Sequence, residues 1–419
     1  MVELNALLAV VLTGANDDGA DGLAAVRQRQ GHALVQDPAE AEARQMPLAA
    51  LERVAAAGLM PVSARAAFTP IPRAGGALLK PSLNAYSFLE LLNANAKDKT
   101  KGLDLFKLCE FCAQQNFDAV DLTGYFFPGY PGAPTDDYLY ALKRHAHALG
   151  LAISGTGVRN DFTAADPKIR AEGVQRLKTW IEVAAKLGAP TVRAFADSQS
   201  PFKNWQQAAN NAPRDTVEGY LADALRECAE HGKKFGVIVA VQNHGDFINT
   251  GPEHLSLLNR VGSEWCAAMV DTGKYLTPDP YADIALMAPY AVNWQIKETT
   301  RSEVDSPKTD MKRLVTIIRQ SGYRGYVPIE TLSMRRKEYD SYVEITKMLR
   351  DLQAAIAATA CSGSGLRTTW APAPSPLPTW NDPNGHRIVV ASFAGAVTHP
   401  AWYVNLRDRE AKEGLSSRP

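Results

Sequence analysis

Residues 216–247 read TVEGYLADALRECAEHGKKFGVIVAVQNHGDF. The first part carries apolar residues at helical spacing and ends at Gly236, a residue type that suits the left-handed end of a helix. The branched residues at 237–241 predict a buried strand, and the polar run QNHGD begins as that strand ends. The segment is therefore one helix followed by one strand, with polar side chains at the carboxyl end of the strand.

The same unit recurs along residues 81–358. The predicted strands cover residues 82–86, 118–122, 151–155, 190–195, 237–241, 267–271, 291–296 and 326–330. Amphipathic helices separate these strands, and Gly150, Gly188 and Gly322 follow helices as Gly236 does. Eight β-then-α units over about 280 residues fit a (β/α)8 TIM barrel. A doubly wound open sheet is the alternative, but no glycine-rich phosphate loop follows the first strand.

Two composition breaks set the expected domain boundaries. Residues 64–80 lack periodicity and contain proline and glycine, and residues 359–383 are rich in serine, glycine and proline. Both stretches are typical of linkers. The predicted organisation is a short segment at 1–63, the barrel at 81–358 and a second short appendage at 384–419.

Bulk composition excludes several function classes. The chain has 419 residues, of which 46% are hydrophobic, so it can bury a large core. Lys plus Arg and Asp plus Glu number 45 each, which gives no electrostatic case for nucleic acid or an anionic membrane. The apolar run at 4–14 is too short to span a bilayer and follows Glu3 rather than basic residues, so we expect a buried strand there and a cytoplasmic protein.

The five cysteines do not form a recognisable disulfide framework, because their number is odd and they are scattered. Cys109 and Cys112 form a CxxC within LDLFKLCEFCAQQ, where apolar residues recur at helical spacing. We therefore expect two small buried residues on one helix face rather than a redox or zinc site.

Function in such a barrel lies at the carboxyl ends of the strands. After the first four strands, the candidate substrate-binding residues are Tyr86, Asp121, Tyr125, Arg159, Asn160 and Arg193. After the last four, the candidates are Gln242, His244, Asp271, Gln295, Lys297, Glu298 and Glu330, with Glu298 assigned to the substrate. Each alone has a structural explanation as a turn, a cap or a surface ion pair. Together, oxygen ligands from four strands converge on one axis, as a hard divalent cation requires.

Four segments carry a resemblance to a known family. They are VQNHGDF at 241–247, VDTGKY at 270–275, WQIKE at 294–298 and PIETL at 328–332. In this order they resemble the signature segments of the xylose-isomerase-like sugar isomerases and epimerases. The resemblance implies a divalent ion (Mn, Mg or Co), a small carbohydrate as substrate and no nucleotide cofactor; a homo-oligomer stays open.

The predicted metal ligands depart from the family's pattern, which is Glu, Asp, His and Glu. Asp271 and Glu330 match it, whereas Gln242 replaces the first Glu and Gln295 replaces the His. The resemblance still predicts an oxygen site for a hard metal on these four side chains. An amide cannot take a proton from carbon, however, so one of two opposed acid/base groups is missing.

One-base chemistry remains. In this hypothesis Glu330 removes the proton next to a sugar carbonyl, and Lys297 or His244 assists. That mechanism serves a sugar isomerase or epimerase, and equally a lyase that eliminates a β-substituent from a 3-keto-glycoside. A third alternative is a non-catalytic sugar-binding barrel whose metal site is degenerate.

The two ends carry separate resemblances. Residues 4–62 are similar to the C-terminal part of the chemotaxis receptor methylesterase catalytic domain, with Asp18 where that family's triad carboxylate lies. We expect no esterase activity, because a lone Asp cannot perform triad chemistry. Residues 384–406 are similar to a segment of deazaflavin-dependent nitroreductases, which is too short to form a cofactor pocket.

Overall fold

In a computed structural model, the chain divides into two compact units. One unit holds residues 65–367, and the other holds residues 1–64 with 368–419. The structure describes residues 8–11, 19–23, 32–35, 43–56, 68–301, 306–331, 339–360, 379–381 and 387–389. Asp18 and most of the predicted appendage at 384–419 lie outside these described residues.

The larger unit is a closed barrel of eight parallel strands, which confirms the predicted fold class. The strands are β3 (Leu78–Asn84), β4 (Ala119–Thr123), β5 (Ala152–Gly157), β6 (Thr191–Phe195), β7 (Ile238–Gln242), β8 (Cys266–Asp271), β9 (Ala291–Lys297) and β10 (Arg324–Glu330). They follow one another around the barrel, and β10 closes it against β3. The carboxyl ends of all eight strands therefore meet at one end of the barrel.

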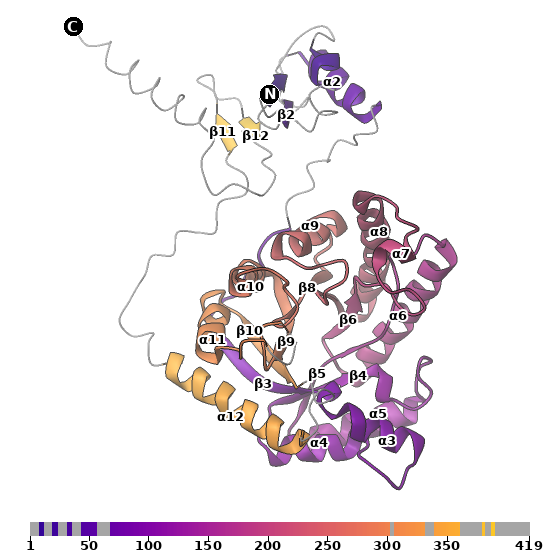
Figure 1. Cartoon of the computed structure of the whole chain (residues 1–419), viewed down its shortest axis with the longest axis vertical. Coiled ribbons are helices and arrows are strands. Elements are labelled where there is room, and N and C mark those ends of the chain that lie inside the picture. The colour runs from indigo at the N-terminus through magenta and orange to yellow at the C-terminus, as the bar shows by residue number, and fades with distance from the viewer. Residues whose placement is uncertain are drawn as a thin grey trace, which may run out of the picture. The chain divides into compact units, whose positions relative to one another are not determined.

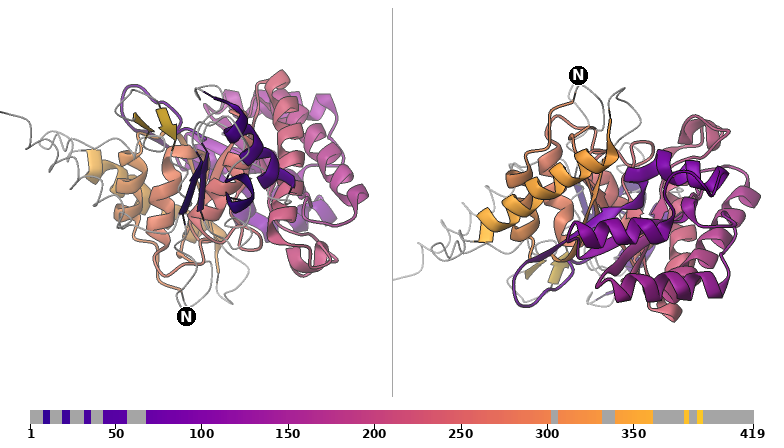
Figure 2. Two further views of the ribbon diagram at one scale, coloured as in Figure 1. Left: turned by 90° about the horizontal axis from the view of Figure 1, so that it is seen from above. Right: turned by 90° about the horizontal axis from the view of Figure 1, so that it is seen from below.

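Helices surround these strands (Figure 1). They are α3 (Leu89–Lys97), α4 (Leu105–Gln114), α5 (Asp136–Ala148), α6 (Pro167–Leu187), α7 (Trp205–Ala208), α8 (Arg214–Phe235), α9 (Gly251–Val261), α10 (Pro280–Met287), α11 (Met311–Gln320) and α12 (Ser341–Ala360), with short 3-10 turns η2 (Ala85–Phe88), η3 (Gly124–Phe126) and η4 (Ala288–Tyr290). Figure 2 shows the same helices from two further directions.

The opening sequence segment forms α8 and β7 as predicted. Gly236 ends α8 with a φ of 68°, and Gly188 ends α6 in the same left-handed conformation. Glycine adopts this conformation without the steric cost of a Cβ, so the chain can turn directly into the next strand. Cys109 and Cys112 are fully buried on α4, as their helical spacing indicates.

The first barrel strand begins earlier than the sequence predicts. β3 starts at Leu78, inside the predicted linker, and pairs with β10 from its first residue onward. The Arg324 side chain also donates hydrogen bonds to the carbonyls of Gly75 and Gly76. Pro81 lacks an N–H and interrupts the sequence pattern of a strand. Pairing with β10 therefore extends β3 where local sequence gives no signal.

The smaller unit contains few described elements. β1 (Leu8–Val11) and β2 (His32–Val35) pair in parallel, and α2 (Gln45–Ala56) follows them. The strand expected in the apolar N-terminal run is β1. Two further strands, β11 (Thr379–Asn381) and β12 (Arg387–Val389), form an antiparallel pair. Within the described parts of the chain, no helix combines the length and the apolar character needed to cross a bilayer.

Candidate functional site

Strands β7 to β10 bring five predicted residues together at their carboxyl ends. Gln242, Asp271, Gln295, Lys297 and Glu330 are each no more than 4% exposed. We call these five residues the charged cluster. A surface ion pair, which was one sequence interpretation of Lys297, is excluded by its burial.

An ammonium group lies between the two carboxylates of the charged cluster. The Nζ of Lys297 bonds to Oε1 of Glu330 and lies 3.5 Å from Oδ2 of Asp271. Burial lowers the pKa of Lys297, but attraction from Asp271 and Glu330 outweighs that effect, so its pKa lies above the usual value. The lysine is therefore a cation at neutral pH.

The amide of Gln242 connects the rest of the charged cluster. Its Nε2 donates hydrogen bonds to Oδ2 of Asp271 at 2.8 Å and to Oε1 of Gln295 at 2.5 Å. Its Oε1 is buried and accepts no hydrogen bond from any described residue. This oxygen is an acceptor without a donor, which is costly in a protein interior unless a ligand supplies one.

Backbone contacts fix Asp271 and Lys297 in place. The Asn243 side chain exchanges two hydrogen bonds with the backbone of Asp271, at 2.9 and 2.8 Å. Oδ1 of Asp271 also accepts from the backbone N–H of Gly273. The backbone N–H of Lys297 donates to Oγ1 of Thr272 at 2.9 Å. Neither end of the ion pair depends on a mobile surface side chain.

The charged cluster does not fit the predicted divalent ion. A cation site needs ligand oxygens with lone pairs directed at the ion. Here the carboxylates are directed at the Lys297 ammonium, and the oxygens of Asp271 and Gln295 accept hydrogen bonds from Gln242. Across the described ranges, no group of three or more His, Cys, Asp or Glu side chains is arranged to hold a metal.

A second set of polar groups lies inside the barrel and is neutral apart from one carboxyl. Oδ2 of Asp121 accepts a hydrogen bond from Nδ2 of Asn293 at 3.0 Å, and the same amide group lies 3.2 Å from Oγ1 of Thr191. A Cβ on Gly155 would collide with all three of these side chains. We call Asp121, Gly155, Thr191 and Asn293 the amide cluster. Burial raises the pKa of Asp121 to about 6.

Aromatic rings and arginines connect the remaining candidates. Tyr86 and Tyr125 meet edge to face, with ring centroids 6.3 Å apart. The Arg159 guanidinium lies 4.8 Å from the Tyr125 ring centre, and Arg193 bonds to the Tyr125 hydroxyl and lies 4.0 Å from the Phe195 ring centre. Burial raises the pKa of Tyr86, and the negative charge of Glu330 raises it further. The charge of Glu330 in the charged cluster therefore acts on Tyr86 at the edge of this group of aromatic residues.

His244 has a carboxylate partner that the sequence analysis missed. Its Nδ1 lies 2.5 Å from Oδ2 of Asp197, and its ring packs against Phe195 with centroids 4.6 Å apart. Asp197 is 6% exposed and follows β6 by two residues. The search for polar residues at strand ends selected Arg193 on this strand. Continuing that search two residues past the end of the strand would have found Asp197.

A family model identifies the family to which the barrel belongs. The model described as a xylose isomerase-like TIM barrel matches residues 109–352, which is more than half of the chain. The chain belongs to this family. The match includes all of the charged cluster and every predicted site residue except Tyr86. Family membership supports the expected isomerase-type enzyme.

Solved structures with this fold include sugar epimerases. A D-psicose 3-epimerase with D-tagatose from Clostridium cellulolyticum H10 has a TM-score of 0.52 and 18% identity, over 67% of this chain and 98% of that one. A 3-keto-D-glucoside 4-epimerase from E. coli has a TM-score of 0.52 and 14% identity, over 66% and 100%. An IOLI protein with a binding zinc atom has a TM-score of 0.51 and 16% identity, over 68% and 100%. At these identities the likeness establishes the fold alone.

The N-terminal segment has a different relative. A CheB methylesterase model matches residues 2–68. A protein-glutamate methylesterase/protein-glutamine glutaminase of Leptospira interrogans is 52% identical over 46 residues, which are 11% of this chain and 24% of that protein. The chain thus spans about a quarter of the length of this relative, and the predicted resemblance of this segment is confirmed.

Two predicted site residues of this xylose isomerase-like barrel, Asn160 and Glu298, form hydrogen bonds with or through the backbone. The side-chain amide of Asn160 exchanges hydrogen bonds with the backbone of Phe195, both at 2.8 Å. Its polar atoms are thus engaged in holding the end of β6. Glu298 is half-buried, and its carbonyl accepts a hydrogen bond from the backbone N–H of Thr309. Their predicted contact with substrate stays a prediction.

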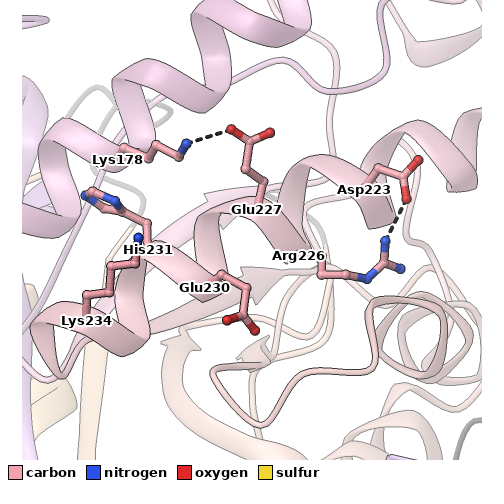
Figure 3. A pocket seen from close by; sticks show the side chains of 7 residues that line it. All are labelled: Lys178, Asp223, Arg226, Glu227, Glu230, His231 and Lys234. Carbon is pink, nitrogen blue, oxygen red and sulfur yellow. Dashed lines mark hydrogen bonds and ion pairs between the residues drawn. The ribbon is translucent and has the colours of Figure 1, made fainter.

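A charged hollow on the outside of the barrel is a separate feature (Figure 3). It is lined by Lys178, Asp223, Arg226, Glu227, Glu230, His231 and Lys234. Lys178 pairs with Glu227 at 2.6 Å, and Arg226 pairs with Asp223 at 2.7 Å. Paired charges on the outward faces of helices are typical of a solvated surface. We assign no chemistry to this hollow.

Proposed function

We propose that this protein is a sugar isomerase or epimerase-type enzyme that moves a proton at the carbon next to a carbonyl. The observation that carries the proposal is the buried Glu330 carboxylate at the end of β10, bonded to the Lys297 ammonium. A carboxylate at the carboxyl end of a barrel strand suits a general base. The predicted divalent ion forms no part of this mechanism, because three of its four predicted ligand side chains already bond to the Lys297 ammonium or the Gln242 amide.

The surrounding residues suit a carbohydrate. Tyr86 and Tyr125 are half-buried aromatic residues, and the exposed guanidinium of Arg159 lies against the Tyr125 ring. A sugar presents apolar C–H faces and hydroxyl edges, which such a mixed surface can hold. Oε1 of Gln242 supplies a buried acceptor for one substrate hydroxyl.

His244 and Asp197 form a second proton-transfer group. In this proposal Nδ1–H of His244 donates a hydrogen bond to the Asp197 carboxylate, which leaves Nε2 of His244 to face the substrate. Asp197 acts as a positioning residue, because it contacts the histidine rather than the sugar. Gln242 cannot exchange a proton with carbon, so Glu330 is the one carboxylate base.

Solvent deuterium incorporation tests the proposed function. The full-length chain is incubated in D2O with ketohexoses and with 3-keto-glucosides, and exchange next to the carbonyl is followed by NMR. Wild type should exchange at least one of these substrates. Glu330→Gln should lower the rate by about 10²–10⁴, the usual contribution of a positioned general base.

The control is Glu227→Gln, the same chemical change at a lysine-paired glutamate on the outer face. It should leave the exchange rate unchanged. Release of the aglycone from a 3-keto-glucoside would identify the lyase alternative instead. Sugar binding without exchange on any substrate, or full activity of Glu330→Gln, contradicts the proposed function.

A further inference from the structure

The position of Lys297 follows from the alternation of β9. Successive side chains of a strand point to opposite faces, so Asn293, Gln295 and Lys297 share one face. The contacts of all three with other barrel strands place that face inside the barrel. The ammonium therefore lies on the same side as the predicted ligand Gln295, rather than at the surface.

Charge counting argues against a second cation in the charged cluster. Asp271 and Glu330 contribute two negative charges, Lys297 contributes one positive charge, and the two amides are neutral. A divalent ion added to this set would change a net single negative charge to a net single positive one. All five side chains are almost fully buried, so little solvent would screen the repulsion between ion and ammonium.

The Gln242 amide occupies two of the predicted ligand oxygens. Its Nε2 is directed at one oxygen of Asp271 and one of Gln295. An ion bound by those two oxygens would need this NH2 group to turn away, since N–H groups cannot ligate a cation. Three of the four predicted ligand side chains, Asp271, Gln295 and Glu330, thus already present an oxygen to a hydrogen donor.

We propose that Lys297 takes the place of a divalent cation, so that this barrel performs its proton transfer without metal. The part that concerns catalysis rests on the proposed function; the exclusion of metal does not. Glu330 takes the proton from carbon, the C–H electron pair forms a C=C bond, and the carbonyl π pair moves onto oxygen. Lys297 donates a hydrogen bond to that oxygen and keeps its proton. The hydroxyl proton of the deprotonated carbon moves to that oxygen, a C=O bond forms at the deprotonated carbon, and Glu330 returns its proton to the former carbonyl carbon, which completes the isomerisation.

A manganese titration tests the metal exclusion directly. The full-length chain is stripped with EDTA, desalted and titrated with Mn²⁺, and free Mn²⁺ is measured by its electron paramagnetic resonance signal. Wild type should bind no Mn²⁺ at the barrel site up to about 1 mM, a concentration at which weak oxygen sites fill. Lys297→Ala should bind one Mn²⁺ with a dissociation constant about 10- to 100-fold below that concentration, the effect of removing one nearby like charge.

Two variants control this result. Lys297→Ala combined with Asp271→Asn should lose the gained binding, which locates the ion in the charged cluster. Lys178→Ala removes an ammonium from an ion pair on the outer face and should gain nothing. If Lys297→Ala does not fold, as judged by circular dichroism, Lys297→Gln serves in its place because it keeps a hydrogen-bond donor.

Two outcomes overturn the proposal. One is a single Mn²⁺ bound by wild type and lost in Asp271→Asn. The other is a folded Lys297→Ala that binds no Mn²⁺, because Lys297 would then not be the group that excludes the ion. The deuterium exchange assay is repeated with EDTA present, and its rate should be unchanged. Exchange that needs added metal overturns the metal-free mechanism alone, whereas absence of exchange under all conditions contradicts only the proposed function.

Discussion

The charged cluster and the amide cluster stabilise buried carboxyl groups in different ways. Asp271 and Glu330 lie against the Lys297 ammonium, whereas Asp121 is bonded to the neutral amide of Asn293. The pKa of Asp121 accordingly rises to about 6 through burial. Burial outweighs the opposing effects of the Asn293 amide and the Arg193 charge on the pKa of Asp121. The same barrel interior thus contains one ion pair that needs its partner and one carboxyl that titrates near neutral pH.

Removal of Lys297 should give the largest effect on stability. Lys297→Met leaves two carboxylates buried without a cation, which should lower the free energy of unfolding by about 3–5 kcal/mol. Urea unfolding at pH 7 measures it. Lys178→Met, at an ion pair on the outer face, should cost about 1 kcal/mol or less. Equal losses in the two variants would show that the charged cluster behaves like a surface ion pair.

Asp121→Asn should stabilise the protein, whereas Lys297→Met should destabilise it. The amide keeps a hydrogen bond to Asn293 and removes the cost of ionising a buried carboxyl, so the free energy of unfolding at pH 8 should rise by about 1–2 kcal/mol. Because the folded pKa of Asp121 lies above its unfolded value, its favourable contribution is lost as pH rises through about 6. The gain should therefore grow between pH 5 and pH 8. A gain that is constant with pH would mean that Asp121 does not titrate in that range.

Ser82→Ala should have the smallest effect. Its hydroxyl forms a 2.8 Å hydrogen bond with that of Ser154, and both groups are buried and neutral. Loss of such a bond should cost about 0.5–1.5 kcal/mol, with no dependence on pH between 5 and 8. A cost as large as that of Lys297→Met would remove the distinction between charged and neutral contacts inside the barrel.

Much of this architecture could be predicted from the sequence. Helical spacing, glycine ends and branched runs gave seven strands close to their observed positions, because each of these signals is local. The early start of β3 was missed, since Pro81 interrupts the pattern and pairing with β10 decides that boundary. Asn293 was also missed, although its spacing of two from Gln295 and of four from Lys297 places all three on one strand face.

The contacts within the site could be predicted only in part. The strand-end rule placed Gln242, Asp271, Gln295 and Glu330 at one end of the barrel, and the structure brings them together. Which way an amide points, and which cation lies between two carboxylates, depends on side-chain torsions that no local pattern records. The sequence therefore predicted a metal among these oxygens, whereas the structure puts the lysine between the carboxylates.

Gly155 shows that a site can depend on a side chain that is not there. In a barrel of eight strands the interior is filled in layers, and each strand normally contributes volume to its layer. At this level β5 contributes only a hydrogen atom, and Asp121, Thr191 and Asn293 from three other strands occupy the vacated room. Three neighbouring side chains therefore occupy the space that a side chain at position 155 would fill. A single methyl group at Gly155 would require all three neighbours to shift, so the packing of this cluster depends on the absence of a side chain at position 155.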